Sequence, residues 1–301
     1  MNSRDGRLRS IWDTARLIWS HPLSSRNRLE AVKRWLRWQV GSRILPGSAI
    51  VPYAGGAVLV VRPGLVGATG NIYLGLHEFE DMSFVLHCLR EGDRFADIGA
   101  NVGTYTVLAS AVRGAESLAI EPVPGTFAHL VDNLRVNGIE ARVRALQVGI
   151  AGRQGVLRFT RSQDAMNHVA RDDESDVTAV PVRTLDEVVG ERVPLVMKID
   201  VEGFETEVIA GGGRTLQDPE LRALIIELNG SGVRYGFDET ALRRRIEAAG
   251  FRPHAYEPFT RRLTAIDPEG RSGNTLYLRD VPTIERRVRE ASPVQVLGLQ
   301  L

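Results

Sequence analysis

The feature that most constrains the fold is a regular alternation of short apolar runs with amphipathic stretches that begins at Arg94. The apolar runs have the length of strands, and the stretches between them have the length and spacing of helices. We expect strands at 94–98, 117–121 and 142–148 and helices at 102–112 and 124–137. Strands that alternate with helices are joined by right-handed crossovers and form a mostly parallel sheet. The sequence therefore predicts a doubly wound α/β domain.

The alternation continues toward the C-terminus with one interruption. TLDEVV predicts a short helix with Thr184 as its N-cap, and VPLVMKID is an apolar run suited to a central parallel strand. The strand LRALIIEL, a helix at 239–249 and the strands RPHAYE and TLYLR follow. Between about 155 and 183, two strand-like runs enclose a polar loop, which indicates a hairpin inserted on the sheet.

The composition predicts one catalytic domain with extensions. The 301 residues are 43% hydrophobic and 25% charged, which is typical of a globular protein. Before the first core strand, AVLVVRP predicts an edge strand and 78–89 a helix. We assign 1–50 to a basic helical arm, 51–90 to a lead-in strand and helix, 91–282 to the catalytic domain and 283–301 to a C-terminal tail.

The basic charge is concentrated in the arm. Residues 1–45 carry ten Lys or Arg against three Asp or Glu, and they hold all four tryptophans, Trp12, Trp19, Trp35 and Trp38. Apolar residues recur there at helical spacing, at Leu29, Val32, Leu36 and Val40. Such a helix can pack its aromatic face on the enzyme body as a structural lid, or make peripheral contact with an anionic membrane or a partner. We favour the lid.

Cysteine content and hydropathy indicate a cytoplasmic protein. Cys88 is the single cysteine, so neither an intrachain disulfide nor a cysteine-rich metal site is expected. The basic N-terminal residues lack the uninterrupted apolar core of a signal peptide, and no apolar run approaches the roughly 20 residues of a spanning helix. Because the basic charge is confined to the arm, we expect no nucleic-acid substrate.

The stretch FADIGANVGTY, residues 95–105, predicts a strand that ends in a glycine turn and continues into a helix. Such turns bind nucleotide-like ligands, because glycine lets the backbone come close and the helix N-terminus offers unpaired N–H groups. Gly99, Asn101 and Gly103 spell G-x-N-x-G, which is neither the dinucleotide pattern nor the phosphate loop. No lysine follows the turn, which argues against a triphosphate.

The spacing from Asp97 to Glu121 suits a nucleoside, because an acid at the end of the second strand reaches the ribose hydroxyls. NAD and S-adenosyl-L-methionine both need that acid. Asp97 and Asn101 suit the ammonium and carboxylate groups of S-adenosylmethionine, whereas Asp97 would repel a pyrophosphate. We therefore favour S-adenosyl-L-methionine as the cofactor, bound by Asp97, Gly99, Asn101, Gly103, Thr104, Glu121 and Pro122.

At this point the sequence resembles a known family. DIGANVGTYT, EPVPGTFAHLVDNLRVN, VRTLDEV, KIDVEGFETEVIAGG and IIELNG stand in the order and approximate spacing of the FkbM-family S-adenosylmethionine-dependent methyltransferases, over roughly residues 73–230. The resemblance implies a Rossmann-like sheet of the class I methyltransferase type. It also implies O-methylation of a hydroxyl on a sugar or a natural-product scaffold. The stretch VGIAG departs from the family, which often has an aspartate where Gly152 stands, near the adenine.

Methyl transfer to a hydroxyl needs alignment and a base that removes the acceptor proton. Asp200, at the predicted strand tip after KI, is the expected base, and His168 in the inserted loop is a second candidate. Structural roles stay open for the same segment. Asp200 could cap the next helix, Glu202 could accept its amide hydrogen bonds, and Lys198 could form an ion pair with Asp200.

The acceptor is expected to be a small hydroxylated molecule. The residues assigned to its side of the pocket are Tyr73, His77, Glu78, Asn167, Glu202, Glu227 and Asn229, with the lead-in segment as a closing lid. Asp200, Glu227 and Asn229 offer oxygen ligands, but no Asp-Asp pair occurs at a strand tip, so we predict no required metal. Two alternatives remain: a nicotinamide-dependent oxidoreductase, and a non-catalytic scaffold that binds a membrane or partner.

Overall fold

A central sheet of eight strands organises the computed structural model, which is described for residues 16–44, 47–62, 66–161, 167–171, 173–268 and 272–301. The strand order is β12-β11-β13-β10-β9-β3-β4-β5. The strands are β3 (Arg94–Ile98), β4 (Glu116–Ile120), β5 (Val143–Leu146), β9 (Val196–Ile199), β10 (Ala223–Leu228), β11 (Arg252–Glu257), β12 (Arg262–Ala265) and β13 (Gly273–Leu278). Strands β5, β4, β3, β9 and β10 run parallel, and β13 runs antiparallel to β10. The predicted doubly wound α/β sheet is confirmed.

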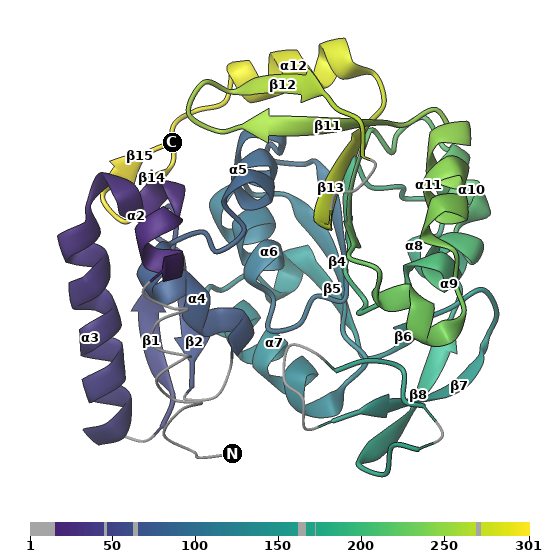
Figure 1. The fold of residues 1–301 in the computed structure, drawn as a ribbon, viewed down its shortest axis with the longest axis horizontal. Helices are drawn as coiled ribbons and strands as arrows, with labels where there is room; N and C mark the ends of the chain where they lie inside the picture. Colours follow the sequence, from purple (N-terminus) through teal and green to yellow (C-terminus); the bar gives the residue numbers. More distant parts are fainter. Residues whose placement is uncertain (1–15, 45–46, 63–65, 162–166, 172, 269–271) are drawn as a thin grey trace.

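Helices cover both faces of this sheet (Figure 1). One face packs on α5 (Phe79–Cys88), α6 (Thr104–Val107) with the π-helical turn Leu108–Val112 that continues it, α7 (Pro124–Val136) and α12 (Val281–Arg289). The other face packs on α8 (Leu185–Val189), α9 (Glu205–Ala210), α10 (Gly213–Gln217) and α11 (Glu239–Ala248). Each face has its own apolar core, so the strands between them are buried on both sides, as expected for parallel strands.

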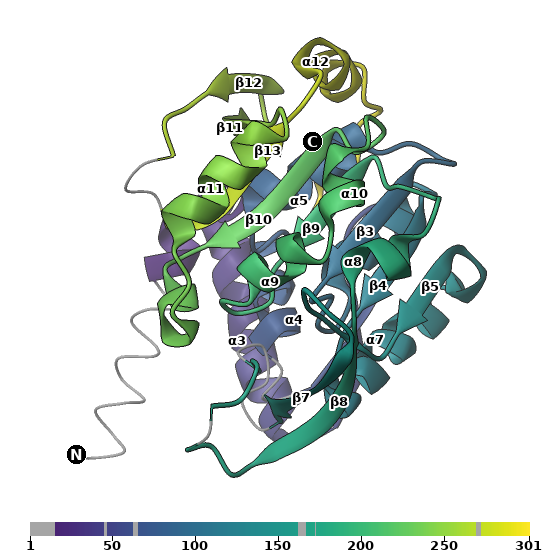
Figure 2. The same ribbon diagram turned by 90° about the vertical axis from the view of Figure 1, so that its right-hand side faces the viewer.

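Two predicted segments form small sheets of their own. The hairpin strands β7 (Gly155–Thr160) and β8 (Val177–Arg183) join β6 (Gly149–Ile150) in a three-stranded sheet below the central one (Figure 2). The predicted edge strand is β2 (Val58–Val61), which pairs with β1 (Ala49–Pro52). The predicted hairpin is confirmed, but it belongs to a separate sheet and not to the central one.

The N-terminal helices α2 (Pro22–Arg26) and α3 (Arg28–Ile44) pack against α4 (Val66–Leu74). His21 Nε2 lies 2.8 Å from the carbonyl oxygen of Leu76, and Ala31 is buried against Leu74. Trp35 and Trp38 are also partly buried against the body, as the lid interpretation expects. Trp12 lies outside the described residues. None of the helices in the described part of the chain is both long and apolar enough to span a bilayer.

The aliphatic positions of α3 do not pack on the body. Leu29, Val32, Leu36 and Val40 are all exposed, and Trp19 is 60% exposed. The lid interpretation therefore holds for the face that carries Trp35 and Trp38, and it was wrong for Trp19.

Candidate functional site

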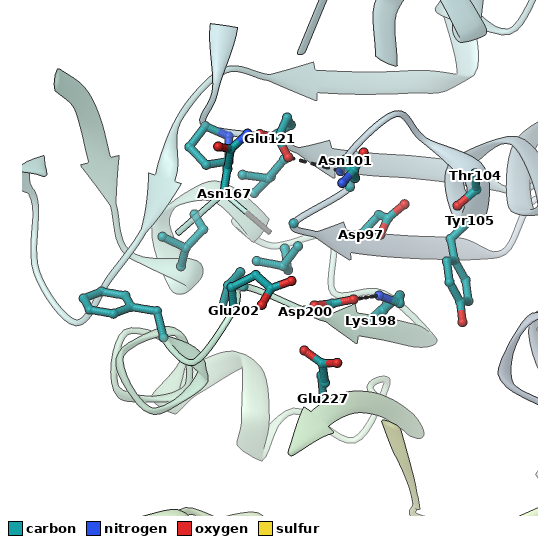
Figure 3. A pocket seen from close by; sticks show the side chains of 18 of the residues that line it. Asp97, Asn101, Thr104, Tyr105, Glu121, Asn167, Lys198, Asp200, Glu202 and Glu227 are labelled. Carbon is teal, nitrogen blue, oxygen red and sulfur yellow. Dashed lines mark hydrogen bonds and ion pairs between the residues drawn. The ribbon is translucent and has the colours of Figure 1, made fainter. Parts of the chain in front are cut away.

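A cavity of about 290 Å³ lies beyond the carboxyl ends of β3, β4, β9 and β10. Strand order reverses between β3 and β9, the position at which open α/β sheets bind ligands. The wall combines residues from the strand tips, the segment before α5 and the three-stranded sheet. Figure 3 shows the side chains at the strand tips. The predicted site residues on this wall are Asp97, Gly99, Asn101, Thr104, Glu121, Pro122, His77, Glu78, Asn167, Asp200, Glu202 and Glu227.

The glycine turn after β3 is shaped by close backbone approach. Gly99 has φ +83°, and a Cβ atom there would lie 1.8 Å from the carbonyl oxygen of Asp200. Gly103 has φ +85° and immediately precedes α6, where a Cβ would lie 2.5 Å from Leu130 Cδ1. Backbone blocks any side chain at Gly99, whereas at Gly103 the positive φ favours glycine and the close atom is the end of a flexible side chain. Gly103 supports the turn from outside the cavity wall.

Glu121 links the tips of β3 and β4. Its Oε2 atom accepts a hydrogen bond from the backbone N–H of Asn101 at 3.1 Å, and its Oε1 atom accepts one from Val123 at 2.9 Å. Burial raises the pKa of this carboxyl to about 7, against the lowering effect of the two amides. Each carboxylate oxygen can still accept a second hydrogen bond, so the group can hold two hydroxyls of a ligand.

Asp97 occupies the base of the turn and is buried. Its Oδ2 atom accepts a hydrogen bond from Thr106 Oγ1 at 2.7 Å. Burial raises the pKa of Asp97, while the Lys198 ammonium acts in the opposite direction. Asn101 has φ +51°, and its Oδ1 atom accepts the N–H of Val102 at 2.7 Å. The turn thus holds a buried acid beside a fixed amide side chain.

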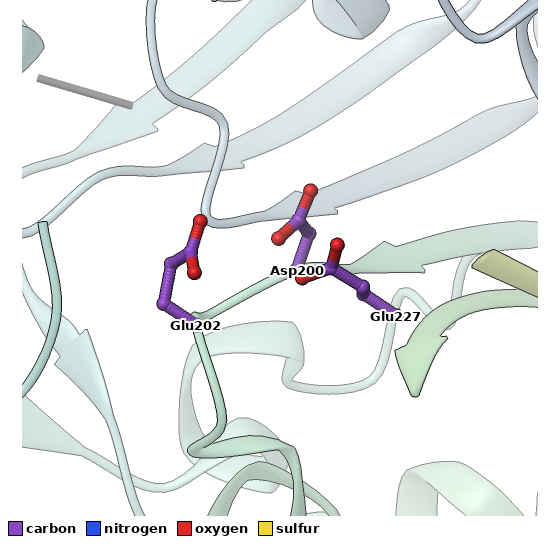
Figure 4. Close-up of side chains that lie close together, drawn as sticks. All are labelled: Asp200, Glu202 and Glu227. Atoms are coloured by element: carbon purple, nitrogen blue, oxygen red, sulfur yellow. The ribbon is translucent and has the colours of Figure 1, made fainter. Parts of the chain in front are cut away.

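Three carboxyl groups meet on the opposite wall. The nearest oxygens of Asp200, Glu202 and Glu227 all lie within 4.8 Å of one another (Figure 4). Burial and the repulsion of Asp200 and Glu202 raise the pKa of Glu227 to about 9, and burial followed by Asp200 raises that of Glu202. Among the described residues, this is the one group of three acids, histidines or cysteines whose atoms are spaced to ligate a metal ion.

The structure decides between the structural roles left open for Lys198 and Asp200. Lys198 Nζ lies 2.6 Å from Asp200 Oδ2, so the predicted ion pair is confirmed, and the N-cap of α9 is Phe204 instead of Asp200. Burial opposes the charge of Lys198, but Asp200, Glu78 and Asp97 raise its pKa. Glu202 has φ +56° and lines the cavity.

Amides of the loop before α9 are accepted by Glu205, which is a different role from the one left open for Glu202. The Oε1 atom of Glu205 accepts the N–H groups of Val201 and Gly203, each at 3.1 Å. The amide-acceptor role of Glu202 stays a prediction, and this residue lines the cavity.

Besides Gly103, three predicted site residues lie outside the cavity wall. His168 is buried with Nε2 at 3.1 Å from Glu174 Oε1, in a separate hollow. Tyr73 packs in the cluster under α3, where its carbonyl accepts Arg34 Nη2 at 3.1 Å. Asn229 is exposed and accepts the N–H of Ser231 at 2.9 Å. The structure does not bring these three residues to the cavity wall, so the catalytic role of His168 and the acceptor-side roles of Tyr73 and Asn229 stay predictions.

Several wall residues were not predicted as site residues. Asn71, Met82, Tyr105, Phe159 and Val169 line the cavity. The ring centroid of Tyr105 lies 4.8 Å from Lys198 Nζ, and burial raises the pKa of its hydroxyl. Tyr105 is the last residue of the FADIGANVGTY motif, and this position was the one sequence signal that could have placed it at the site. The other four reach the cavity through long-range packing, which no local pattern reports.

The departure at VGIAG also has a structural outcome. Val148, Gly149 and Ile150 line the cavity, but Gly152 does not. The N–H of Gly152 donates to Glu207 Oε2 at 3.0 Å. Phe159 and Val169, which belong to one apolar cluster, line the cavity together with Ile150.

The sheet order, the antiparallel strand next to β10, and the acid at the second strand tip define a Rossmann-like fold of the class I methyltransferase type. The Methyltransferase FkbM domain matches residues 97–253, more than half of the chain. The protein belongs to this family.

The hexuronic acid methyltransferase AglP of Haloferax volcanii is 30% identical over 155 residues, which cover 50% of this chain and 62% of that protein. The FkbM methyltransferase of Methylobacillus flagellatus has 17% identity and a TM-score of 0.43, over 62% of this chain and 43% of its own. Precorrin-6Y C5,15-methyltransferase of Geobacter metallireducens has 13% identity and a TM-score of 0.42, over 73% and 93%. Neither structural likeness bears on the chemistry.

Proposed function

We propose that the protein is an S-adenosylmethionine-dependent O-methyltransferase that acts on a hydroxyl of a saccharide or a secondary metabolite. The observation that carries this proposal is the hydrogen bond between Asn101 N and Glu121, which joins the glycine turn to a buried acid on one cavity wall. Asp200 lies on the wall of the same cavity. The name of the Haloferax volcanii relative, a hexuronic acid methyltransferase, supports a sugar acceptor.

The donor end of the cavity suits a nucleoside without phosphates. Glu121 would accept the ribose hydroxyls, and Asp97 with Asn101 would hold the amino-acid end. The apolar wall at Ile150, Phe159 and Val169 would cover the adenine. Lys198 is the one Lys or Arg among the described lining residues, and Asp200 already pairs with it. A pyrophosphate would therefore meet carboxylates without a counter-charge.

The acceptor would enter beside the three carboxyl groups. S-adenosylmethionine, held by Glu121, Asp97 and Asn101, would supply a methyl group activated as a sulfonium for transfer to the acceptor oxygen. Asp200 would take the hydroxyl proton, and Lys198 would hold its carboxylate in place. Glu227, with a pKa of about 9, is protonated at neutral pH and is not the base under those conditions.

Calorimetry with S-adenosylmethionine, S-adenosylhomocysteine and NAD tests the donor. We expect the first two to bind and NAD not to bind. Glu121→Ala should weaken donor binding about 10- to 150-fold, because a hydrogen bond to a charged group contributes roughly 1.5–3 kcal/mol. Glu174→Ala removes an acid outside the cavity and should leave donor affinity unchanged. Binding of NAD alone would contradict the proposal.

Mass spectrometry of hydroxylated acceptors tests the reaction. A panel of neutral sugars, hexuronic acids and hydroxylated metabolite scaffolds should contain a product that is heavier by one methyl group on oxygen. Methylation of amines alone would contradict O-methylation. Chelation with EDTA is expected to leave turnover unchanged. A loss of turnover that Mg²⁺ restores would instead assign Asp200, Glu202 and Glu227 to a metal ion.

A further inference from the structure

Helix α3 has two apolar sides, and only one of them packs on the protein. Ala31, Trp35 and Trp38 lie on the packed side, against α4 and the main core. The other side carries five aliphatic residues that are 37% to 76% exposed: Leu29, Val32, Leu36, Val40 and Ile44. Burying one side of a helix explains a single apolar stripe, so the second stripe is not explained by folding.

The five exposed residues form one continuous stripe. Their spacings are three, four, four and four residues, which keeps them on one side of a helix with about 3.6 residues per turn. The helix has 17 residues and lies at one edge of the molecule, as Figure 1 shows. Five exposed aliphatic residues on one side of a helix mark an interaction surface, whereas single exposed aliphatic residues do not.

Basic side chains flank the stripe. Arg28, Lys33, Arg37 and Arg43 are exposed on α3, and the single acid of the helix, Glu30, pairs with Lys33 at 2.7 Å. The exposed Trp19 lies beside them, with the Arg28 guanidinium carbon 4.4 Å from its ring centroid. An apolar stripe with basic flanks and a neighbouring tryptophan is the composition of helices that lie in a membrane interface.

We propose that the exposed side of α3 docks on an anionic membrane surface, with the five aliphatic residues in the headgroup boundary and the basic residues on lipid phosphates. Charge decides between this occupant and a second copy of the chain. Pairing two copies of α3 through the stripe would bring the flanking cations of both helices together, where like charges repel. An anionic lipid surface neutralises them instead.

Vesicle co-sedimentation tests the proposal. The full chain should bind vesicles of phosphatidylcholine mixed with phosphatidylglycerol, bind phosphatidylcholine alone more weakly, and lose affinity in high salt. Val40→Glu should weaken binding to the mixed vesicles at least about 10-fold, because it places a charge where the valine side chain would enter the lipid headgroup boundary. Val156→Glu is the matched control, since Val156 on β7 is 67% exposed against 55% for Val40. Melting temperatures should show both variants folded.

Three results would overturn the proposal. One is failure of the full chain to bind the mixed vesicles at low salt. Another is equal binding by Val40→Glu and the unmodified protein, which would reduce the effect to general charge attraction. The third is a dimer in sedimentation velocity that Val40→Glu dissociates, which would assign the stripe to a second copy. None of these results depends on the identity of the methyl acceptor.

Discussion

Lys198 lies on β9, and Asp200 follows the last residue of that strand. Because the two residues are two positions apart, their side chains point to the same side of the sheet and form an ion pair. This places the Asp200 carboxyl group at the strand tip next to the glycine turn, on the wall of the cavity. His168, the other candidate base, points into a different hollow. The geometry therefore makes a clear distinction between the two candidates.

Asp200→Asn should keep S-adenosylmethionine affinity within a few fold but lower turnover roughly 10²- to 10⁴-fold, because it removes the base and leaves the donor end intact. His168→Ala should change turnover little, since His168 lies outside the cavity wall. Single-turnover methylation with both variants measures the effect. Near-normal turnover in Asp200→Asn would show that this residue only positions Lys198.

Glu227 gives a pH-dependent prediction for stability without ligand. Its pKa is raised from 4.5 to about 9 by burial, Asp200 and Glu202, so the folded state binds this proton more tightly than the unfolded state. The stabilising contribution of the proton is complete below about pH 4.5 and is lost as the pH rises to about 9. Glu227→Gln lacks this loss, because glutamine resembles the protonated acid in shape and charge.

The melting temperature of Glu227→Gln should therefore exceed that of the unmodified protein by a margin that grows between about pH 6 and about pH 9. The margin corresponds to about 1–2 kcal/mol, after allowance for partial solvent screening. Glu191→Gln, an exposed acid before β9, controls for the loss of one charge and should show a constant difference. A constant difference for Glu227→Gln as well would contradict a raised pKa.

At the scale of elements, the turns at the strand tips determine the site. Gly99 brings the turn after β3 against the backbone of Asp200 at the end of β9, with no space for a Cβ atom. The backbone N–H groups of Gly99 and Ala100 both donate to the carbonyl of Ile120 on β4, at 2.9 and 2.8 Å. The turn after β3 thus contacts the ends of both neighbouring strands, β4 and β9, and this fixes the distance between Glu121 and Asp200.

Gly99→Ala should destabilise the fold by more than about 3 kcal/mol and abolish donor binding, because the Cβ atom meets backbone that cannot move aside. Gly138→Ala is the matched control. Gly138 also has a positive φ, +63°, but nothing lies within 4 Å of its Cβ position, so only strain of about 1–2 kcal/mol is expected. Urea unfolding of both variants measures the difference. Equal destabilisation would mean that backbone strain alone selects glycine at position 99.

The elements that sequence patterns predict well are those whose signals are local. The strand at 94–98 has the predicted bounds, and Thr184 caps α8 by accepting the N–H of Glu187. Strand β12 was missed, because RLTA is only four residues long and lies at the exposed edge of the sheet. The separate three-stranded sheet and the hollow that holds His168 depend on long-range pairing, which no short window of sequence contains.

At the scale of the whole molecule, the N-terminal helices support the wall of the site from outside. Ala31 on α3 packs on Leu74 at the end of α4, and His21 contacts the carbonyl of Leu76. The chain continues from there to His77 and Glu78 on the cavity wall. Packing of α3 should therefore affect the acceptor side of the cavity, although α3 itself contributes no described residue to its wall.

Ala31→Glu and Val32→Glu separate the two sides of α3 with adjacent residues. Ala31 has no exposed surface, so a glutamate there must either bury a charge or push α3 away from α4. Its melting temperature should fall by several degrees, corresponding to about 2–4 kcal/mol, and the acceptor KM should rise more than the donor Kd. Val32 is exposed, and Val32→Glu should melt like the unmodified protein. Thermal unfolding gives the melting temperature of both variants, calorimetry gives the donor Kd, and initial-rate kinetics give the acceptor KM. An unchanged melting temperature in Ala31→Glu would mean that α3 does not support the enzyme body.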